Sequence, residues 1–111
     1  MNIDTETVIV NLLKEDKKTY LSVKRLLKLI CFIYDELSEK FELNNYQLAF
    51  DFNFDSIERT VLYNNNVFEL DIDGEIIYLR ESKSVESLVT QYPVDDRVTE
   101  LIREFKNRYA A

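Results

Sequence analysis

The side chains with the clearest chemical potential are carboxylates concentrated in the middle of the chain. Residues 41–81 contain nine acidic and two basic side chains, so this segment alone accounts for the net charge of −7. The flanking segments, 1–40 and 82–111, each contain equal numbers of acids and bases. A dense set of carboxylates attracts Lys and Arg side chains, and such an association weakens as salt is added. The chemistry that this segment favours is recognition of a basic partner.

Part of the acidic segment resembles the first half of a calcium-binding loop. Acids alternate at Glu69, Asp71 and Asp73, and Gly74 stands at the sixth position. An EF-hand also needs a bidentate Glu at the twelfth position, where this chain has Arg80. The alternating apolar residues around the motif favour a β-hairpin over a calcium loop. We therefore expect no metal site, and a surface cation site among these acids is the less favoured alternative.

The composition excludes most enzyme chemistries. The chain contains no His, one Gly and one Pro. Without His, neither a Ser–His nor a Cys–His nucleophile system can form, and the commonest general base is missing. A single Gly excludes a Walker A loop and a dinucleotide-binding fingerprint. Catalysis by carboxylates alone is the remaining enzyme hypothesis, and we expect a non-enzymatic protein without a cofactor.

Length and composition predict one soluble α+β domain over residues 1–111. Hydrophobic residues make up 46% of the chain, which is enough for a packed core. No apolar run reaches the roughly 20 residues that span a bilayer, and the acidic N-terminus is unlike a signal peptide. The single Cys31 cannot form an internal disulfide, so we expect a cytoplasmic location. The 41 Phe, Tyr, Met, Ile, Asn and Lys residues reflect AT-rich codons, which indicates a low-GC bacterium or its phage.

Helical spacing of apolar residues predicts two helices at the start of the chain. The first begins at Asp4 or Thr5 and ends at the polar segment 15–18. The second runs from Thr19 to about Lys40, and its wide apolar stripe predicts that it is the central helix. Near the other end of the chain, a short helix is expected to begin at Ser82 or Ser84, and a last helix is expected to begin near Asp95.

Between residues 46 and 81 the apolar period changes to two, which is typical of strands. Two-residue turns are predicted at Asp55-Ser56, Asn65-Asn66 and Asp73-Gly74, and the last has the strongest turn sequence. Each turn fixes which residues lie opposite each other on the two strands that it joins. The three pairings agree, because together they place one set of apolar residues on a common inner face. That set is Leu48, Phe50, Phe52, Phe54, Ile57, Val61, Tyr63, Phe68, Leu70, Ile72, Ile77 and Leu79. The expected fold is a four-stranded antiparallel β-meander, packed on one face by the helices in the order α-α-β-β-β-β-α-α.

The predicted register places a binding surface on the outer face of this sheet. Acidic side chains would surround an apolar and aromatic centre, which is the anatomy of a protein-binding patch. The alternative is an ordinary solvated sheet face, which is normally polar. The predicted partner-binding residues are Asp51, Glu58, Glu69, Asp71, Asp73, Tyr78 and Leu62.

A second charged region lies near the predicted junction of the first two helices. Two helices with a short turn and this charge are compatible with a helix-turn-helix. A solvated helix face is the favoured interpretation, so direct nucleic-acid binding is not expected. The basic residues are Lys14, Lys17, Lys18, Lys24, Arg25 and Lys28.

A local sequence pattern runs from the predicted hairpin into the short helix. It comprises Asp73-Gly74, Glu81-Ser82 and Glu86-Ser87-Leu88-Val89, about a sixth of the chain. In this pattern the chain resembles small acidic anti-CRISPR proteins of phages and mobile elements in low-GC bacteria, although its longer N-terminal helical region departs from them. The resemblance implies inhibition of a type II CRISPR effector nuclease by occupation of its basic DNA cleft.

These observations predict a non-enzymatic, DNA-mimicking inhibitor encoded by a phage or mobile element. Its acidic sheet face would block a basic nucleic-acid-binding protein, and no membrane partner is expected. Two alternatives stay open at this point, a homo-oligomeric regulatory or assembly module and a toxin immunity protein.

Overall fold

The computed structural model describes residues 1–109, and over these residues the chain has an α+β fold with five α-helices and two small sheets. In chain order the elements are β1 (Asn2–Asp4), α1 (Thr5–Asp16), β2 (Tyr20–Ser22), α2 (Val23–Glu39), η1 (Leu43–Asn45), β3 (Gln47–Ala49), α3 (Phe54–Tyr63), β4 (Phe68–Leu70), β5 (Ile76–Leu79), α4 (Val85–Gln91) and α5 (Asp96–Arg108). No helix within residues 1–109 combines the length and apolar character that a membrane crossing requires.

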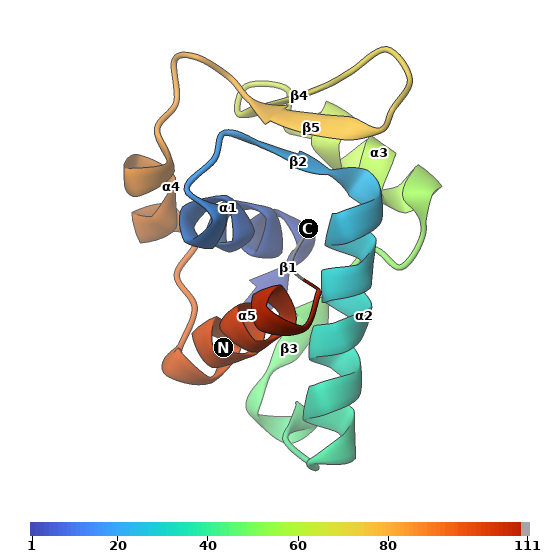
Figure 1. Cartoon of the computed structure of the whole chain (residues 1–111), viewed down its shortest axis with the longest axis vertical. Coiled ribbons are helices and arrows are strands. Elements are labelled where there is room, and N and C mark those ends of the chain that lie inside the picture. Colours follow the sequence, from blue (N-terminus) through green and yellow to red (C-terminus); the bar gives the residue numbers. More distant parts are fainter. Residues whose placement is uncertain (110–111) are drawn as a thin grey trace.

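The first helix, α1, lies at the centre of the fold, in place of the longer helix that the sequence favoured. Eight of its residues between Thr5 and Leu13 are buried, because the segment is apolar on nearly every side. Figure 1 shows α2, α4, α5 and the larger sheet around it. The amide of Asn11 donates 2.8 Å hydrogen bonds to the carbonyls of Thr7 and Tyr92. This buried Asn therefore joins α1 to the segment between α4 and α5.

The larger sheet has the strand order β2-β5-β4 and is antiparallel throughout. Its inner face carries Leu21, Phe68 and Ile77, which are buried against the helices. The outer face carries Tyr20, Tyr78 and Glu69 in neighbouring register. The smaller sheet pairs β1 with β3 in parallel.

The prediction of a four-stranded meander is wrong, because residues 54–63 form a helix. Asn53 caps α3, with its side chain accepting a 2.8 Å hydrogen bond from the backbone N–H of Ser56. Ile57 and Val61 are fully buried, and a spacing of four fits a helix face as well as alternate strand positions. The predicted turn at Asp55-Ser56 lies inside the first turn of α3. The meander's first two registers therefore do not exist.

The register of the last predicted hairpin is confirmed, but its turn is displaced by one residue. Phe68 lies opposite Leu79 and Leu70 opposite Ile77, as predicted. The turn is centred on Ile72 and Asp73, because the Gly74 N–H donates a 3.0 Å hydrogen bond to the carbonyl of Asp71. Gly74 has a φ of 71°, in the left-handed region that glycine adopts without steric cost.

Other boundaries and faces also differ from the expectation. Residues 20–22 form β2 rather than helix, and Ser22 caps α2. At the other end of the chain, Ser84 and Asp95 cap α4 and α5 as predicted. Four residues of the predicted inner face are instead exposed. These are Phe52, Phe54, Tyr63 and Ile72. The predicted strands around the first three are absent, and the fourth lies in the turn between β4 and β5.

Candidate functional site

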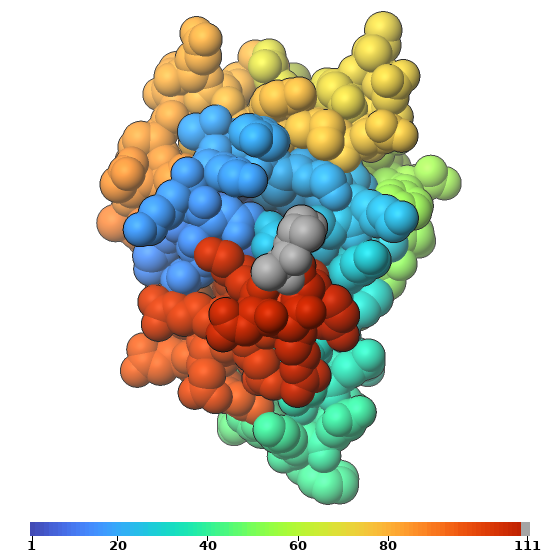
Figure 2. All heavy atoms as spheres, viewed as in Figure 1, coloured from blue at the N-terminus to red at the C-terminus, as the bar shows by residue number. Residues whose placement is uncertain are grey.

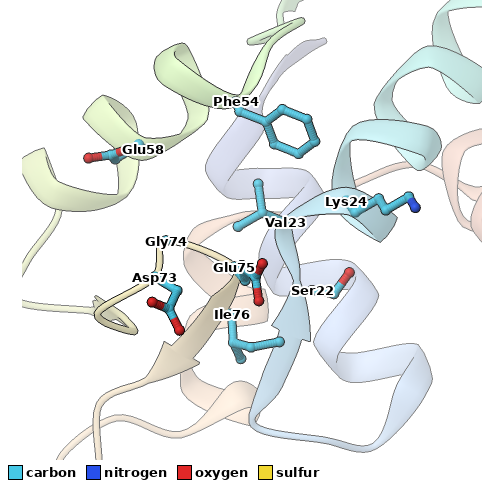
Figure 3. Close-up of a pocket in the computed structure, with 9 residues that line it drawn as sticks. All are labelled: Ser22, Val23, Lys24, Phe54, Glu58, Asp73, Gly74, Glu75 and Ile76. Atoms are coloured by element: carbon cyan, nitrogen blue, oxygen red, sulfur yellow. The ribbon is translucent and has the colours of Figure 1, made fainter.

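An acidic groove opens between the first turns of α3, the tip of the β4–β5 hairpin and the start of α2. Its volume is about 530 Å³. Figure 3 shows the side chains that line it, which are Ser22, Val23, Lys24, Phe54, Glu58, Asp73, Glu75 and Ile76, together with Gly74. We call this site the acidic groove.

The acidic groove combines three carboxylates with an apolar wall. Glu58, Asp73 and Glu75 are exposed, and within residues 1–109 none of them has a basic nitrogen within 4.0 Å. Figure 3 shows Lys24 extending away from these acids. Phe54, half of whose surface is exposed, lies near Val23 on the same wall. Uncompensated acids beside an accessible aromatic ring favour a ligand that is both basic and partly apolar.

The tip of the hairpin is held in place by Asp71. Its Oδ1 accepts hydrogen bonds from the backbone N–H groups of Glu75 at 2.6 Å and Ile76 at 3.0 Å. A Cβ added at Gly74 would lie 3.9 Å from Glu58 Oε2, which shows how closely α3 approaches the turn. Asp71, predicted as a partner contact, therefore positions the groove.

A second, shallower groove of about 410 Å³ brings together four of the seven predicted contact residues. Leu62, Glu69, Asp71 and Tyr78 line it with Arg80. Arg80 Nη1 lies 2.7 Å from Glu69 Oε1, so the Glu69 charge is compensated by an exposed ion pair. This groove is less acidic than the first, although it also borders α3 and β4.

Asp51 lies apart from both grooves and has an internal role. Its backbone N–H donates to Thr5 Oγ1 at 2.9 Å, and its Oδ2 accepts from Thr60 Oγ1 at 2.7 Å. These bonds join the segment before α3 to α1 and to α3 itself. The structure thus brings Glu58 and Asp73 together in the acidic groove and separates Asp51 from them.

Three exposed or half-buried aromatic residues were missed as functional candidates. The rings of Tyr34 and Phe52 pack edge to face with centroids 5.5 Å apart, and Phe50 lies 6.1 Å from Phe52. Phe52 precedes Phe54 of the acidic groove by two residues. For Phe52, the signal that could have found it is the Asn53 cap, because a helix starting there ends the strand that would have buried this residue.

The largest change in a carboxyl pKa occurs outside both grooves, at the start of α1. Burial and the neighbouring Asp4 raise the pKa of Glu6 to about 7, although Asn64 donates a hydrogen bond to it. Burial also opposes ionisation of Asp4, but hydrogen bonds from Thr7 outweigh it and lower the pKa of that carboxyl. Neither acid lines the acidic groove or the second groove, so we assign this pair to the fold.

Within residues 1–109, no cluster of three or more His, Cys, Asp or Glu side chains is arranged to hold a metal ion. Searches against family models, curated proteins and solved structures find no match for this chain. What the acidic groove can do chemically is to pair carboxylates with cationic groups beside an aromatic contact. Its geometry is suited to recognition.

Proposed function

We propose that this chain is a non-enzymatic protein inhibitor that binds a basic, nucleic-acid-binding partner through the acidic groove. The observation that carries the proposal is that Glu58, Asp73 and Glu75 share a groove with Phe54. Among the described residues, no basic nitrogen lies within 4.0 Å of these three carboxylates. Carboxylates placed in this way compete with phosphates for the Lys and Arg side chains of a nucleic-acid site. A CRISPR effector nuclease inside a bacterial cell is one partner of this kind.

The arrangement also matches the anatomy of protein interfaces. Such interfaces place aromatic anchors at the centre and charged groups at the rim. Phe54 supplies the anchor and the three carboxylates supply the rim. Electrostatic steering by the acids would speed association at low salt.

The test compares two double variants with matched loss of charge. Glu58→Gln with Asp73→Asn removes charge from the acidic groove, whereas Glu39→Gln with Asp96→Asn removes the same charge from exposed positions elsewhere. Each protein is used to capture partners from lysate of a low-GC bacterium at two salt concentrations. We expect the wild type and the control to capture the same basic protein and the groove variant to lose it.

A captured protein is then purified, and its binding to nucleic acid is measured with and without this chain. Loss of nucleic-acid binding in the complex supports inhibition. Equal capture by both double variants would contradict the assignment of the groove, and a complex that still binds nucleic acid would contradict inhibition.

A homo-oligomeric module is the second candidate, favoured by the exposed aromatic residues outside the groove. Tyr34 is 39% exposed and Phe52 is 49% exposed, and apolar surface of this kind is often covered by a second copy. Light scattering of the wild type and of Phe52→Ser distinguishes the two. A dimer that Phe52→Ser converts to a monomer would support the oligomer, whereas a monomer at all concentrations would exclude it.

A further inference from the structure

A band of basic side chains crosses one face of the molecule through two grooves that meet at Lys18. One groove, of about 650 Å³, lies between the start of α2 and the end of α5. The other, of about 540 Å³, lies between the end of α1 and the start of α4. Figure 2 shows these segments on one face, with residues 14–28 in blue and cyan, α5 in red below them and α4 in orange at one side. The basic residues that line the two grooves, here called the basic band, are Lys14, Lys17, Lys18, Lys24, Arg25, Lys28, Lys83 and Lys106.

The basic band is poorly compensated by acids. Only two acids, Asp16 and Glu86, line the same grooves. The side chain of Asp16 is nearly buried. It forms ion pairs with Arg25 and, at 3.5 Å, with Lys106, and so restrains these two cations. Within residues 1–109, none of the other six lysines has a carboxylate oxygen within 4.0 Å. Six unpaired ammonium groups in adjoining grooves form a local field that attracts a polyanion.

Accessible tyrosine rings lie among these cations. Tyr20 is 47% exposed and Tyr109 is 52% exposed, and both line the larger groove. The ring of Tyr78 lies 6.3 Å from that of Tyr20, on the same outer sheet face. Lys18 Nζ lies 5.5 Å from the centre of the Tyr20 ring. Aromatic rings flanked by lysines are the combination that binds bases by stacking and phosphates by charge.

We propose that the basic band binds single-stranded nucleic acid. A basic groove with aromatic platforms tracks the backbone of a single strand, whereas a duplex would present its bases only to an element that enters a groove. The band is concave and contains rings with polar tips, which fits a strand better than the flat surface of a membrane. The assignment goes beyond the proposed function, because it needs no protein partner and uses a basic surface that shares only Ser22, Lys24 and Ile76 with the acidic groove.

The test measures binding of a fluorescent oligonucleotide of about 12 nucleotides, as DNA and as RNA, by anisotropy over a range of salt concentrations. If all six unpaired lysines contact phosphates, the logarithm of the affinity falls with the logarithm of salt with a slope of about −4. Lys18→Ala with Lys28→Ala, which leaves the acidic groove unchanged, should weaken binding by about tenfold and make the slope shallower by about 1.4. The matched control, Lys40→Ala with Arg59→Ala, removes two cations outside the band and should change neither quantity.

A second pair of variants tests stacking separately from charge. Tyr20→Ala should weaken binding by about tenfold without changing the salt slope, and Tyr20→Phe should retain the affinity. Duplex DNA and vesicles containing anionic phospholipids serve as competing probes. Equal affinities of the lysine double variant and its matched control would overturn the proposal. Binding to vesicles or to duplex DNA in preference to single strands would also overturn it. Thermal unfolding of each variant confirms that the fold is retained.

Discussion

The side-chain amide of Asn64 donates a 2.6 Å hydrogen bond to Glu6 Oε1 and thereby ties the end of α3 to the first turn of α1. Glu6 also lies beside Asp4, the residue that caps α1. The contact joins two elements that are 58 positions apart in sequence. Burial and the neighbouring Asp4 oppose the ionisation of Glu6 more strongly than the Asn64 hydrogen bond favours it, and this gives the fold a pH dependence that can be measured.

The stability of the protein is expected to fall as the pH rises from about 5 to about 8. The pKa of Glu6 is raised from 4.5 to about 7 in the folded state, so the folded state binds more protons than the unfolded state between these values. Glu6→Gln imitates the protonated form and should remove this dependence. The difference in melting temperature between the variant and the wild type should therefore shift in favour of the variant as the pH rises from about 5 to about 8. An equal pH dependence in both proteins would contradict the assignment.

Because residues 54–63 form a helix, substitutions at two positions that a meander would place on one face should change the free energy of unfolding by very different amounts. Ile57 is fully buried in α3, whereas Tyr63 is 89% exposed at its end. Ile57→Ala should lower the free energy of unfolding by about 2–5 kcal/mol, and Tyr63→Ala should change it by less than about 0.5 kcal/mol. Urea denaturation measures both, and similar losses would favour the meander.

Asp51 should affect stability but not partner binding. Its carboxylate accepts a hydrogen bond from the Thr60 hydroxyl, and loss of such a bond costs about 1 kcal/mol of stability. Asp51→Ala should lower the free energy of unfolding by this amount and leave partner affinity at the wild-type level. Thr60→Val closes a double-mutant cycle, in which the two losses should not add. A loss of affinity in Asp51→Ala without a loss of stability would place Asp51 in the interface.

There is room for a side chain at Gly74, but the backbone conformation at this position is unfavourable for residues other than glycine. The nearest atoms to an added Cβ are 3.9 and 4.0 Å away, which is ordinary contact, yet φ is +71°. Gly74→Ala should therefore lower the free energy of unfolding by about 1 kcal/mol. Gly74→Asn should cost less, because Asn adopts the left-handed region more readily. Equal losses in the two variants, measured in urea, would show that contact rather than conformation is limiting.

The parts of the fold that the sequence predicted correctly depend on short-range signals. The β4–β5 register was predicted correctly, although its turn is centred one residue earlier than expected, and Ser84 and Asp95 marked helix starts. The segment 54–63 was ambiguous because Ile57 and Val61 suit either period. The strands β1 and β2 are three residues each, and they exist because of partners that lie far away in sequence. No local pattern encodes such pairing.

The candidate site was predictable in its residue types but not in its shape. Glu58 and Asp73 were both predicted as contacts, because the excess of acids is visible in the sequence. Their convergence in one groove depends on α3 lying beside the hairpin tip, which the meander did not allow. Phe54 was predicted to face inward for the same reason. The acidic character of the site could thus be predicted from the sequence. The shape of the groove could not, because it depends on how α3 packs beside the hairpin.

The central position of α1 has a consequence for synthesis on the ribosome. This helix is made well before α4 and α5, which cover it, and before Tyr92, whose carbonyl accepts a hydrogen bond from Asn11. Its apolar surface must therefore wait for almost the whole chain to emerge. Stable folding is expected only once α5 has emerged, and until then the nascent chain is a natural client for chaperones that shield apolar helices.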